Sequence, residues 1–242
     1  MRNAKLVSVA VVAMGLAPSA CTPQAAQKTA AEALVVDHAK QEVRLSGVVQ
    51  KTGAPRMADW GSAVPALLGT KDGSNARFFL FLVDARIPDI YQALLSLGAR
   101  PKVAFGDEGV VQHAGRPLQI VKEGYMAGDP VLIFIEWDTP QGRKRLAYED
   151  GFLEKATVDG KEATRPWAPH FVLHGSAILS EAGTGCLACT HDCPGGIIGN
   201  NVLALHKGIP TLKANWAVLP APGTRVSVVL RPAPSAPPTR RE

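Results

Sequence analysis

The sequence predicts an α+β fold, a mostly antiparallel β domain that carries one clear amphipathic helix. Two observations lead to this prediction. Short apolar or alternating runs recur between residues 34 and 231, and turn residues separate them, as in a sheet of short strands. One segment, at about residues 88–97, instead has apolar residues at helical spacing. The span from 34 to 231 is long enough for one domain with its own core.

The apolar runs set the expected strands. Residues 43–49 alternate in strand fashion, and a turn at 37–41 joins them to 34–36. The runs at 77–83 and 131–137 are almost continuously apolar, which indicates buried strands. Residues 142–145 are expected to return the second of these runs as a hairpin. Further strands are expected at 171–173 and 226–230.

The expected helix has recognisable ends. Pro88 and Asp89 are typical of a helix start, and Gly98 is placed to end it. Apolar residues between Ile90 and Leu95 fall on one helical face, so we expect this helix to pack on the sheet. A second, weaker helix is expected at 201–207.

The first 20 residues have the layout of a bacterial export signal. Arg2 and Lys5 precede an uncharged apolar run at 6–16, which is shorter than the roughly 20 residues of a membrane-spanning helix. Ser19 and Ala20 then lead to Cys21, which resembles the end of a lipoprotein signal, although Pro18 stands where Leu is usual. We therefore expect a diacylglyceryl group on Cys21.

The alternative is ordinary cleavage near Ala20 or within 24–26, which would leave a soluble periplasmic protein. Either way the expected location is the periplasm or cell envelope, and the favoured form is a membrane-anchored lipoprotein. Residues 21–33 are expected to be a tether and residues 232–242 a disordered, Pro-rich tail.

Composition and motifs exclude several functions. The net charge is +5, but part of it lies in the signal and the tail, so the folded part is close to neutral. Without a basic face the chain is not expected to bind nucleic acid. It also has no P-loop, no Gly-x-Ser-x-Gly and no dinucleotide-binding turn. We therefore expect a non-enzymatic role.

A cysteine cluster is the most informative motif. Cys186, Cys189 and Cys193 have the spacing C-x2-C-x3-C, and His191 stands between the last two. A tight loop can turn the first two sulfurs to one side, where the third can join them. Thiolates bind soft or borderline metals, so the pattern predicts a metal-binding loop.

The identity of the metal stays open. Three thiolates and one imidazole complete a tetrahedral zinc site, with His191 or His174 as the candidate fourth ligand, and copper is the other single-ion candidate. The run also matches the C-x2-C-x3-C-P part of a bacterial ferredoxin motif, but Gly183 stands where a further Cys is needed. Export of an unfolded chain argues against a cluster assembled in the cytoplasm.

Chemistry without a metal is the alternative. Exported proteins meet an oxidising compartment, where cysteines pair. If Cys21 is lipidated, three cysteines remain, so two can form a disulfide and leave one free thiol. Such a disulfide is either structural or exchanges with partners.

Three segments resemble the YdjY-domain family. They are the strand that contains Gly47, the stretch 87–101 with its helix and Leu-Gly-Ala-x-Pro ending, and the stretch 184–198 around the cysteines. The resemblance covers about 34–232. It implies that the cysteine loop belongs to one branch of the family, where it has been interpreted as ferredoxin-like, and that the scaffold folds without it. It implies no catalytic residues.

Together these observations predict an exported envelope protein whose cysteine loop binds a metal ion or an iron–sulfur-type centre, for metal binding or electron transfer. Expected partners are an envelope redox or assembly protein and, through the lipid anchor, the membrane. One alternative is a thiol–disulfide redox protein that uses the same cysteines. The other is a structural, partner-binding lipoprotein.

Overall fold

A computed structural model describes residues 33–50, 66–101, 127–158, 160–177, 183–193, 195–203 and 210–233. The expected signal peptide, Cys21, the tether up to residue 32 and the tail from residue 234 lie outside the described residues. The expected helix at 201–207 is a turn as far as residue 203 and lies outside them beyond that point.

Strands make up most of the regular structure. In chain order the elements are β1 (Leu34–Asp37), β2 (Glu42–Val49), β3 (Ala66–Thr70), η1 (Ala76–Phe78), β4 (Phe81–Val83), α3 (Ile87–Ser96), β5 (Val131–Thr139), β6 (Gly142–Ala147), η3 (Tyr148–Gly151), β7 (Phe152–Val158), β8 (Lys161–Pro166), β9 (Phe171–Leu173), β10 (Cys186–Cys189), β11 (Ile198–Asn200), β12 (Leu212–Ala214) and β13 (Arg225–Pro232).

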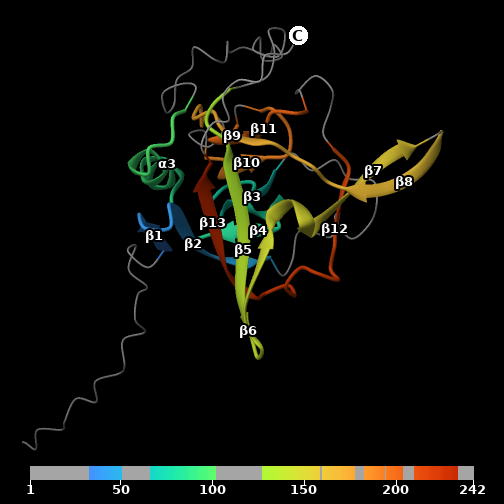
Figure 1. Cartoon of the computed structure of the whole chain (residues 1–242), viewed down its shortest axis with the longest axis horizontal. Helices are drawn as coiled ribbons and strands as arrows, with labels where there is room; N and C mark the ends of the chain where they lie inside the picture. The colour runs from blue at the N-terminus through green and yellow to red at the C-terminus, as the bar shows by residue number, and fades with distance from the viewer. Residues whose placement is uncertain are drawn as a thin grey trace, which may run out of the picture.

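One large sheet organises the domain (Figure 1). Its strand order is β6-β5-β13-β2-β4-β3-β10-β11-β9, and β1 adds to β2. The sheet curls until β9 returns to the start of β5. There Pro130 bridges Val172, and the Leu173 amide donates to the Asp129 carbonyl at 2.8 Å. The two ends of the strand order therefore meet.

The expected α+β class is wrong, because the described residues form a mostly β protein. α3 has ten residues, and the two 3-10 helices are single turns. The curl of the sheet explains why more helix is not needed, since a curled sheet buries much of its inner face against itself. The pairing is also mixed, because β3–β4 and β10–β11 are parallel.

The core follows strand alternation. Inward residues of the central strands are completely buried, as the alternating sequence of β2 predicts. These residues are Val43, Leu45, Val49, Phe81, Val83, Ile135, Val228 and Leu230. A cluster of aromatic rings lies at one end of the core, with ring centroids 5.2–6.2 Å apart. It comprises Phe81, Tyr148, Phe152, Trp167 and Phe171.

The helix expected at about 88–97 is confirmed as α3. Its first turn carries Pro88, and Arg86 donates two hydrogen bonds to the Asp89 carboxylate. Ile90 and Leu94 are fully buried against the sheet. Gly98 ends the helix with φ +84°, a conformation that side chains with a Cβ rarely adopt.

The prediction of a strand at 77–83 is confirmed only for its last three residues. Residues 76–78 form the single turn η1, Phe78 is 40% exposed, and only Phe81–Val83 joins the sheet as β4. The Gln50 side chain donates to the carbonyls of Ala76 and Phe79, which holds this turn. The strands expected at 34–36, 43–49, 131–137, 171–173 and 226–230 and the hairpin return are confirmed.

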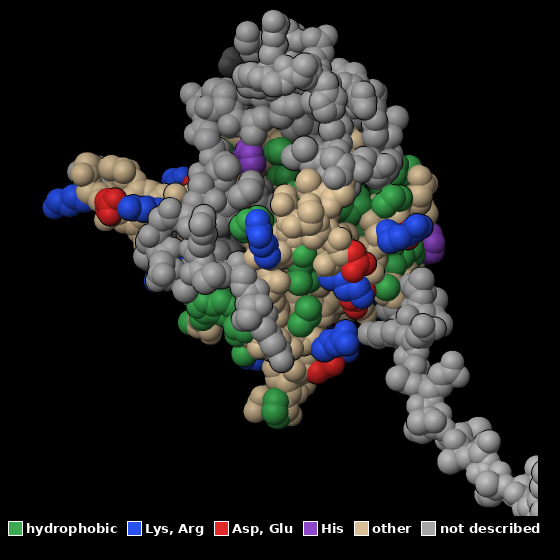
Figure 2. All heavy atoms as spheres, turned by 180° about the vertical axis from the view of Figure 1, so that it is seen from behind, with side chains coloured by type: hydrophobic (Ala, Val, Ile, Leu, Met, Phe, Trp, Pro, Cys, Tyr) green, Lys and Arg blue, Asp and Glu red, His purple; other side chains and the backbone are tan. Residues whose placement is uncertain are grey.

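A second, three-stranded sheet of β12, β7 and β8 extends from the body. Its β7–β8 hairpin projects clear of the large sheet (Figures 1 and 2). The hairpin carries both signs of charge, with ion pairs between Lys155 and Glu162 and between Arg165 and Glu154. Within the described stretches of chain, no helix is long and apolar enough to cross a membrane.

Candidate functional site

The first two cysteines lie on a strand, whereas the sequence predicted a loop for this segment. Cys186 and Cys189 begin and end β10, which pairs with β3 on one side and β11 on the other. In a regular strand, residues three apart face opposite sides. Here the register shifts between Cys186 and Ala188 and again between Ala188 and Cys189, so β10 is distorted where it carries the two cysteines.

All three cysteines are buried, and none of them forms a disulfide. Cys186 is 7%, Cys189 2% and Cys193 8% exposed. Each sulfur interacts electrostatically with the next, Cys186 with Cys193 and Cys189 with both. The sequence prediction that the sulfur of the third cysteine joins the other two around one centre stays a prediction.

The closest contact joins Cys189 and Cys193. The Cys189 thiol donates a hydrogen bond to the Cys193 sulfur. This bond contributes most to the low pKa of Cys193, which lies well below that of an ordinary thiol in spite of burial. The His191 imidazole and the Gly195 amide, 3.3 Å from the sulfur, also favour the Cys193 thiolate.

The other two thiols stay protonated. The hydrogen bond to Cys193 and then burial raise the pKa of Cys189 well above its usual range. Burial also raises the pKa of Cys186, although hydrogen bonds with Thr184 and Asn75 act against this. The site therefore combines a sulfur whose pKa is lowered with a thiol that donates to it.

The two candidate histidines have different places. His191 is 2% exposed and reaches the Cys193 sulfur, and its Nδ1 has no hydrogen-bond partner among the described residues. His174 is completely buried and directs Nδ1 to Ser176, 3.3 Å from the amide and 3.1 Å from the hydroxyl. Burial lowers the pKa of His174 to about 3, so this imidazole is neutral. His191 therefore acts on the Cys193 sulfur, whereas His174 lies against the backbone of Ile198 and Cys193.

The fit of a metal can be judged from these donors. Within the described residues, no three His, Cys, Asp or Glu side chains are grouped as ligands of one ion. Sulfur and imidazole are ligands that suit zinc or copper. Here, however, two of the sulfurs form a hydrogen-bonded pair, and the other donors surround that pair. The metal centre at Cys186, Cys189, Cys193 and His191 or His174 therefore stays a prediction, and the arrangement does not fit it as it stands.

Glycine is required next to the pair. A Cβ at Gly196 would lie 2.4 Å from the Leu187 carbonyl oxygen and 3.1 Å from that of Cys186. The backbone after Cys193 therefore packs directly on β10.

Comparisons with known proteins identify the family of this chain. A family model described as the YdjY domain matches residues 34–231. The chain belongs to the YdjY-domain family. It is 26% identical over 166 residues to the uncharacterized protein YdjY of Escherichia coli strain K12, an alignment that covers 66% of this chain and 64% of that protein. No solved structure matches.

The YdjY domain also contains a buried ion cluster that sequence reasoning did not find. Glu42 is fully buried on β2 and accepts hydrogen bonds from Arg44, Arg145 and Arg231. Glu136, 6% exposed, is bound by Arg44 and Arg145. The sequence shows these residues only as alternating charges on separate strands, so pairing across β2, β5, β6 and β13 was not predictable.

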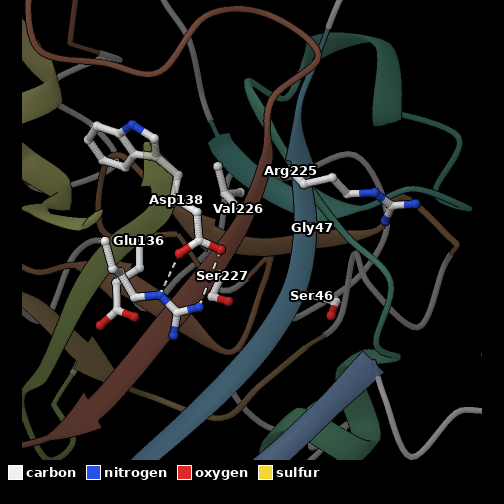
Figure 3. Close-up of a pocket in the computed structure, with 9 residues that line it drawn as sticks. Ser46, Gly47, Glu136, Asp138, Arg225, Val226 and Ser227 are labelled. Carbon is white, nitrogen blue, oxygen red and sulfur yellow. Dashed lines mark hydrogen bonds and ion pairs between the residues drawn. The ribbon is translucent and has the colours of Figure 1, made fainter. Parts of the chain in front are cut away.

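A shallow pocket of about 160 Å³ lies beside this cluster (Figure 3). Arg143 donates a hydrogen bond to the Asp138 carboxylate. Figure 3 shows Asp138 with Ser227 alongside, while Arg225 points away from them. The charged groups of the pocket are thus already paired, Arg225 with Asp84 at 3.7 Å. In this YdjY domain the cysteine site is the stronger functional candidate.

Proposed function

We propose that this YdjY-domain protein is a thiol–disulfide redox protein in which Cys189 and Cys193 form the redox pair. The hydrogen bond from the Cys189 thiol to the Cys193 sulfur supports this proposal most directly. Two thiols already in contact need only a small movement to reach the 2.05 Å of a disulfide.

The two members of the pair have different roles. Cys193 is the more exposed and carries the thiolate, so it is the attacking sulfur. Cys189, 2% exposed, is the resolving sulfur. This division follows the chemistry of exchange, in which the thiolate attacks and a neighbouring thiol completes the disulfide.

The reaction balances with a disulfide as the oxidant. The Cys193 thiolate attacks one sulfur of a partner disulfide, forms a mixed disulfide and releases the other partner sulfur as a thiolate. The Cys189 proton passes to that thiolate. The Cys189 sulfur then attacks Cys193, and the second partner thiolate leaves. Two electrons go from the pair to the partner disulfide.

We place this chemistry at the cell envelope. The support is the export signal at residues 1–20 and the lipid-anchor pattern at Cys21. An oxidising compartment also supplies disulfide partners. Labelling cells with a palmitate analogue tests the anchor, because Cys21→Ser should abolish the label if the anchor is present. Unchanged labelling in that variant would reject it.

Equilibration of the full chain in dithiothreitol or glutathione buffers tests the redox pair, with alkylation and mass spectrometry as the measurement. We expect one disulfide, between Cys189 and Cys193, to form over a narrow range of potential. Cys189→Ser and Cys193→Ser should abolish it. Cys186→Ser is the matched control and should retain it.

Metal analysis of the same anaerobic preparation separates the proposal from its rival. About one zinc or copper ion per chain, or several irons with sulfide, lost in Cys189→Ser, would overturn the redox proposal and establish the metal centre. An oxidised form with a different pairing, such as Cys186 with Cys189, would also overturn it.

A further inference from the structure

We infer that a cavity at the end of β13, beside the guanidinium of Arg231, binds the carboxylate of a small organic acid whose remaining part is apolar. We call it the Arg231 cavity. The inference goes beyond the redox proposal and does not depend on it, since no cysteine or histidine lines this cavity among the described residues.

The Arg231 cavity lies where separate segments of the chain end together, on the side of the domain that carries α3 (Figure 1). The turn between β1 and β2 contributes Gln41, the end of α3 contributes residues 97–100, and the last residues of β13 contribute Arg231 and Pro232. The volume of the cavity is about 560 Å³. Ligand pockets usually measure about 300–1,000 Å³, so this cavity is large enough to hold a small molecule.

Arg231 offers the cavity a cation whose donors are not all used. Its side chain is 38% exposed, and a guanidinium has five N–H donors. Among the described residues, its hydrogen bond goes from Nη2 to the Glu42 carboxylate, and its buried Nε has no partner. Because the planar guanidinium matches the geometry of a carboxylate, Arg231 can bind a second carboxylate while it keeps Glu42.

The ion cluster that contains Arg231 has one positive charge in excess. Three guanidinium groups, of Arg44, Arg145 and Arg231, are paired with only two carboxylates, of Glu42 and Glu136. Three positive charges against two negative charges leave one positive charge. A single excess charge beside a cavity favours a monoanion, such as a carboxylate, over a phosphate dianion.

Other carboxylates near the cavity have cations of their own. Asp129 lines the cavity and accepts hydrogen bonds from the backbone amide and the guanidinium of Arg100. Asp37 lies opposite Glu42 in the β1–β2 pair and forms an ion pair with Lys40 at 3.2 Å. These carboxylates therefore do not cancel the excess charge at Arg231.

The rest of the lining favours an apolar body for the ligand. Leu97, Ala99 and Pro232 present carbon to the cavity. The Gln41 side-chain amide donates to the His38 carbonyl at 2.8 Å, so its donor is directed back into its own turn. One cation beside an otherwise apolar lining matches an acid with one carboxylate and a short hydrocarbon chain.

Isothermal titration calorimetry of the full chain with sodium hexanoate tests the site. We expect one saturable site. Hexanamide has the same size without the charge and should bind about tenfold more weakly, and Arg231→Gln should weaken hexanoate binding by a similar factor. Arg143→Gln is the matched control, because it removes the same charge from the separate pocket beside Asp138, and it should leave hexanoate binding unchanged.

A second pair of variants keeps binding separate from folding, since Arg231 also supports Glu42. Gln41 is exposed and lies outside the ion cluster. A negative charge at this position should repel a carboxylate, so Gln41→Glu should weaken hexanoate binding several-fold, and Gln41→Lys should strengthen it.

Several results would overturn the inference. They are the absence of saturable hexanoate binding, hexanamide binding as tight as that of hexanoate, or hexanoate binding that neither Arg231→Gln nor Gln41→Glu weakens. If Arg231→Gln fails to fold, the two Gln41 variants decide the question. Inorganic phosphate that binds more tightly than hexanoate would overturn the assignment of a monocarboxylate. None of these results bears on the disulfide expected between Cys189 and Cys193, so the two proposals fail separately.

Discussion

The curled sheet buries polar groups in two regions that differ in the kind of group that pairs with them. In the ion cluster, Glu42 and Glu136 are paired with the guanidinium groups of Arg44, Arg145 and Arg231. At the thiol site, the Cys193 sulfur is held by the Cys189 thiol, the His191 imidazole and the Gly195 amide, and the Nδ1 of His191 has no partner among the described residues. The first region therefore stabilises the fold, and the second retains capacity for chemistry.

The ion cluster also closes the outer face of the sheet. The guanidinium of Arg145 lies 3.9 Å from the centroid of the Phe134 ring, and that of Arg231 lies 5.4 Å from it. Burial acts to raise the pKa of Glu42, but hydrogen bonds from Arg231 and Arg145 outweigh this and lower it. A carboxylate in this setting is ionised in the folded protein at neutral pH.

The largest expected effect comes from breaking the ion cluster. Glu42→Gln leaves three arginines with one buried carboxylate, and removing one partner of a buried ion pair is costly. We expect the free energy of unfolding in urea to fall by about 3 kcal/mol. The redox behaviour of the cysteines should be unchanged. A loss no greater than that expected for a surface ion pair would contradict the claim that the Glu42 cluster stabilises the fold.

The second effect is a pH dependence that belongs to the thiol region. Burial lowers the pKa of His174 to about 3, whereas an unfolded histidine titrates near 6.5. The unfolded chain therefore takes up a proton first, so stability is full above about pH 6.5 and falls as pH falls toward 3. Between pH 7 and pH 5 this contribution to the free energy of unfolding should fall by about 2 kcal/mol.

Urea unfolding at several pH values checks this expectation. His174→Asn should flatten the curve between pH 7 and pH 5, while the exposed His170→Asn serves as control and should not. The lowered pKa of Glu42 acts in a separate window, since its stabilising contribution is present above about pH 4.3 and lost as pH falls through the folded pKa. If stability changed over one and the same pH range for both groups, the two regions would be coupled.

A smaller effect on stability, with a clear effect on reactivity, is expected for Cys189→Ala. Loss of a small buried side chain should cost about 1 kcal/mol, measured by urea unfolding. Removing the thiol donor raises the pKa of Cys193, so its alkylation at pH 6 should slow. Cys186→Ala is the control and should slow it less, since the hydrogen bond from Cys189 contributes most to the low pKa of Cys193. Equal slowing would show that the three sulfurs act as one unit.

The smallest effect is expected at the rim of the pocket. Asp138 and Arg143 are hydrogen-bonded to one another, but both are largely exposed to water. Exposed ion pairs contribute little to stability. The urea midpoint of Asp138→Asn should therefore match that of the wild type. A large shift would mean that burial is not what distinguishes the Glu42 cluster.

Local pattern was enough for much of the fold. Alternation identified β2, continuous apolar runs identified β5, and Pro88, Asp89 and Gly98 marked the ends of α3. These features depend on residues close together in the chain. The fold class was wrong because the curl of the sheet depends on how distant strands meet, such as Pro130 with Val172.

The candidate site shows the same division between what the sequence predicted and what the tertiary structure decided. The spacing C-x2-C-x3-C by itself determined that the three cysteines are neighbours in the chain, and the YdjY resemblance is a property of the sequence alone. Only the tertiary structure decided their surroundings. Cys186 and Cys189 are buried on the irregularly paired strand β10, and the Cys189 thiol donates to the Cys193 sulfur. Spacing limits what neighbouring residues can reach, but burial and partners come from strands distant in sequence, and these set the charge on each sulfur.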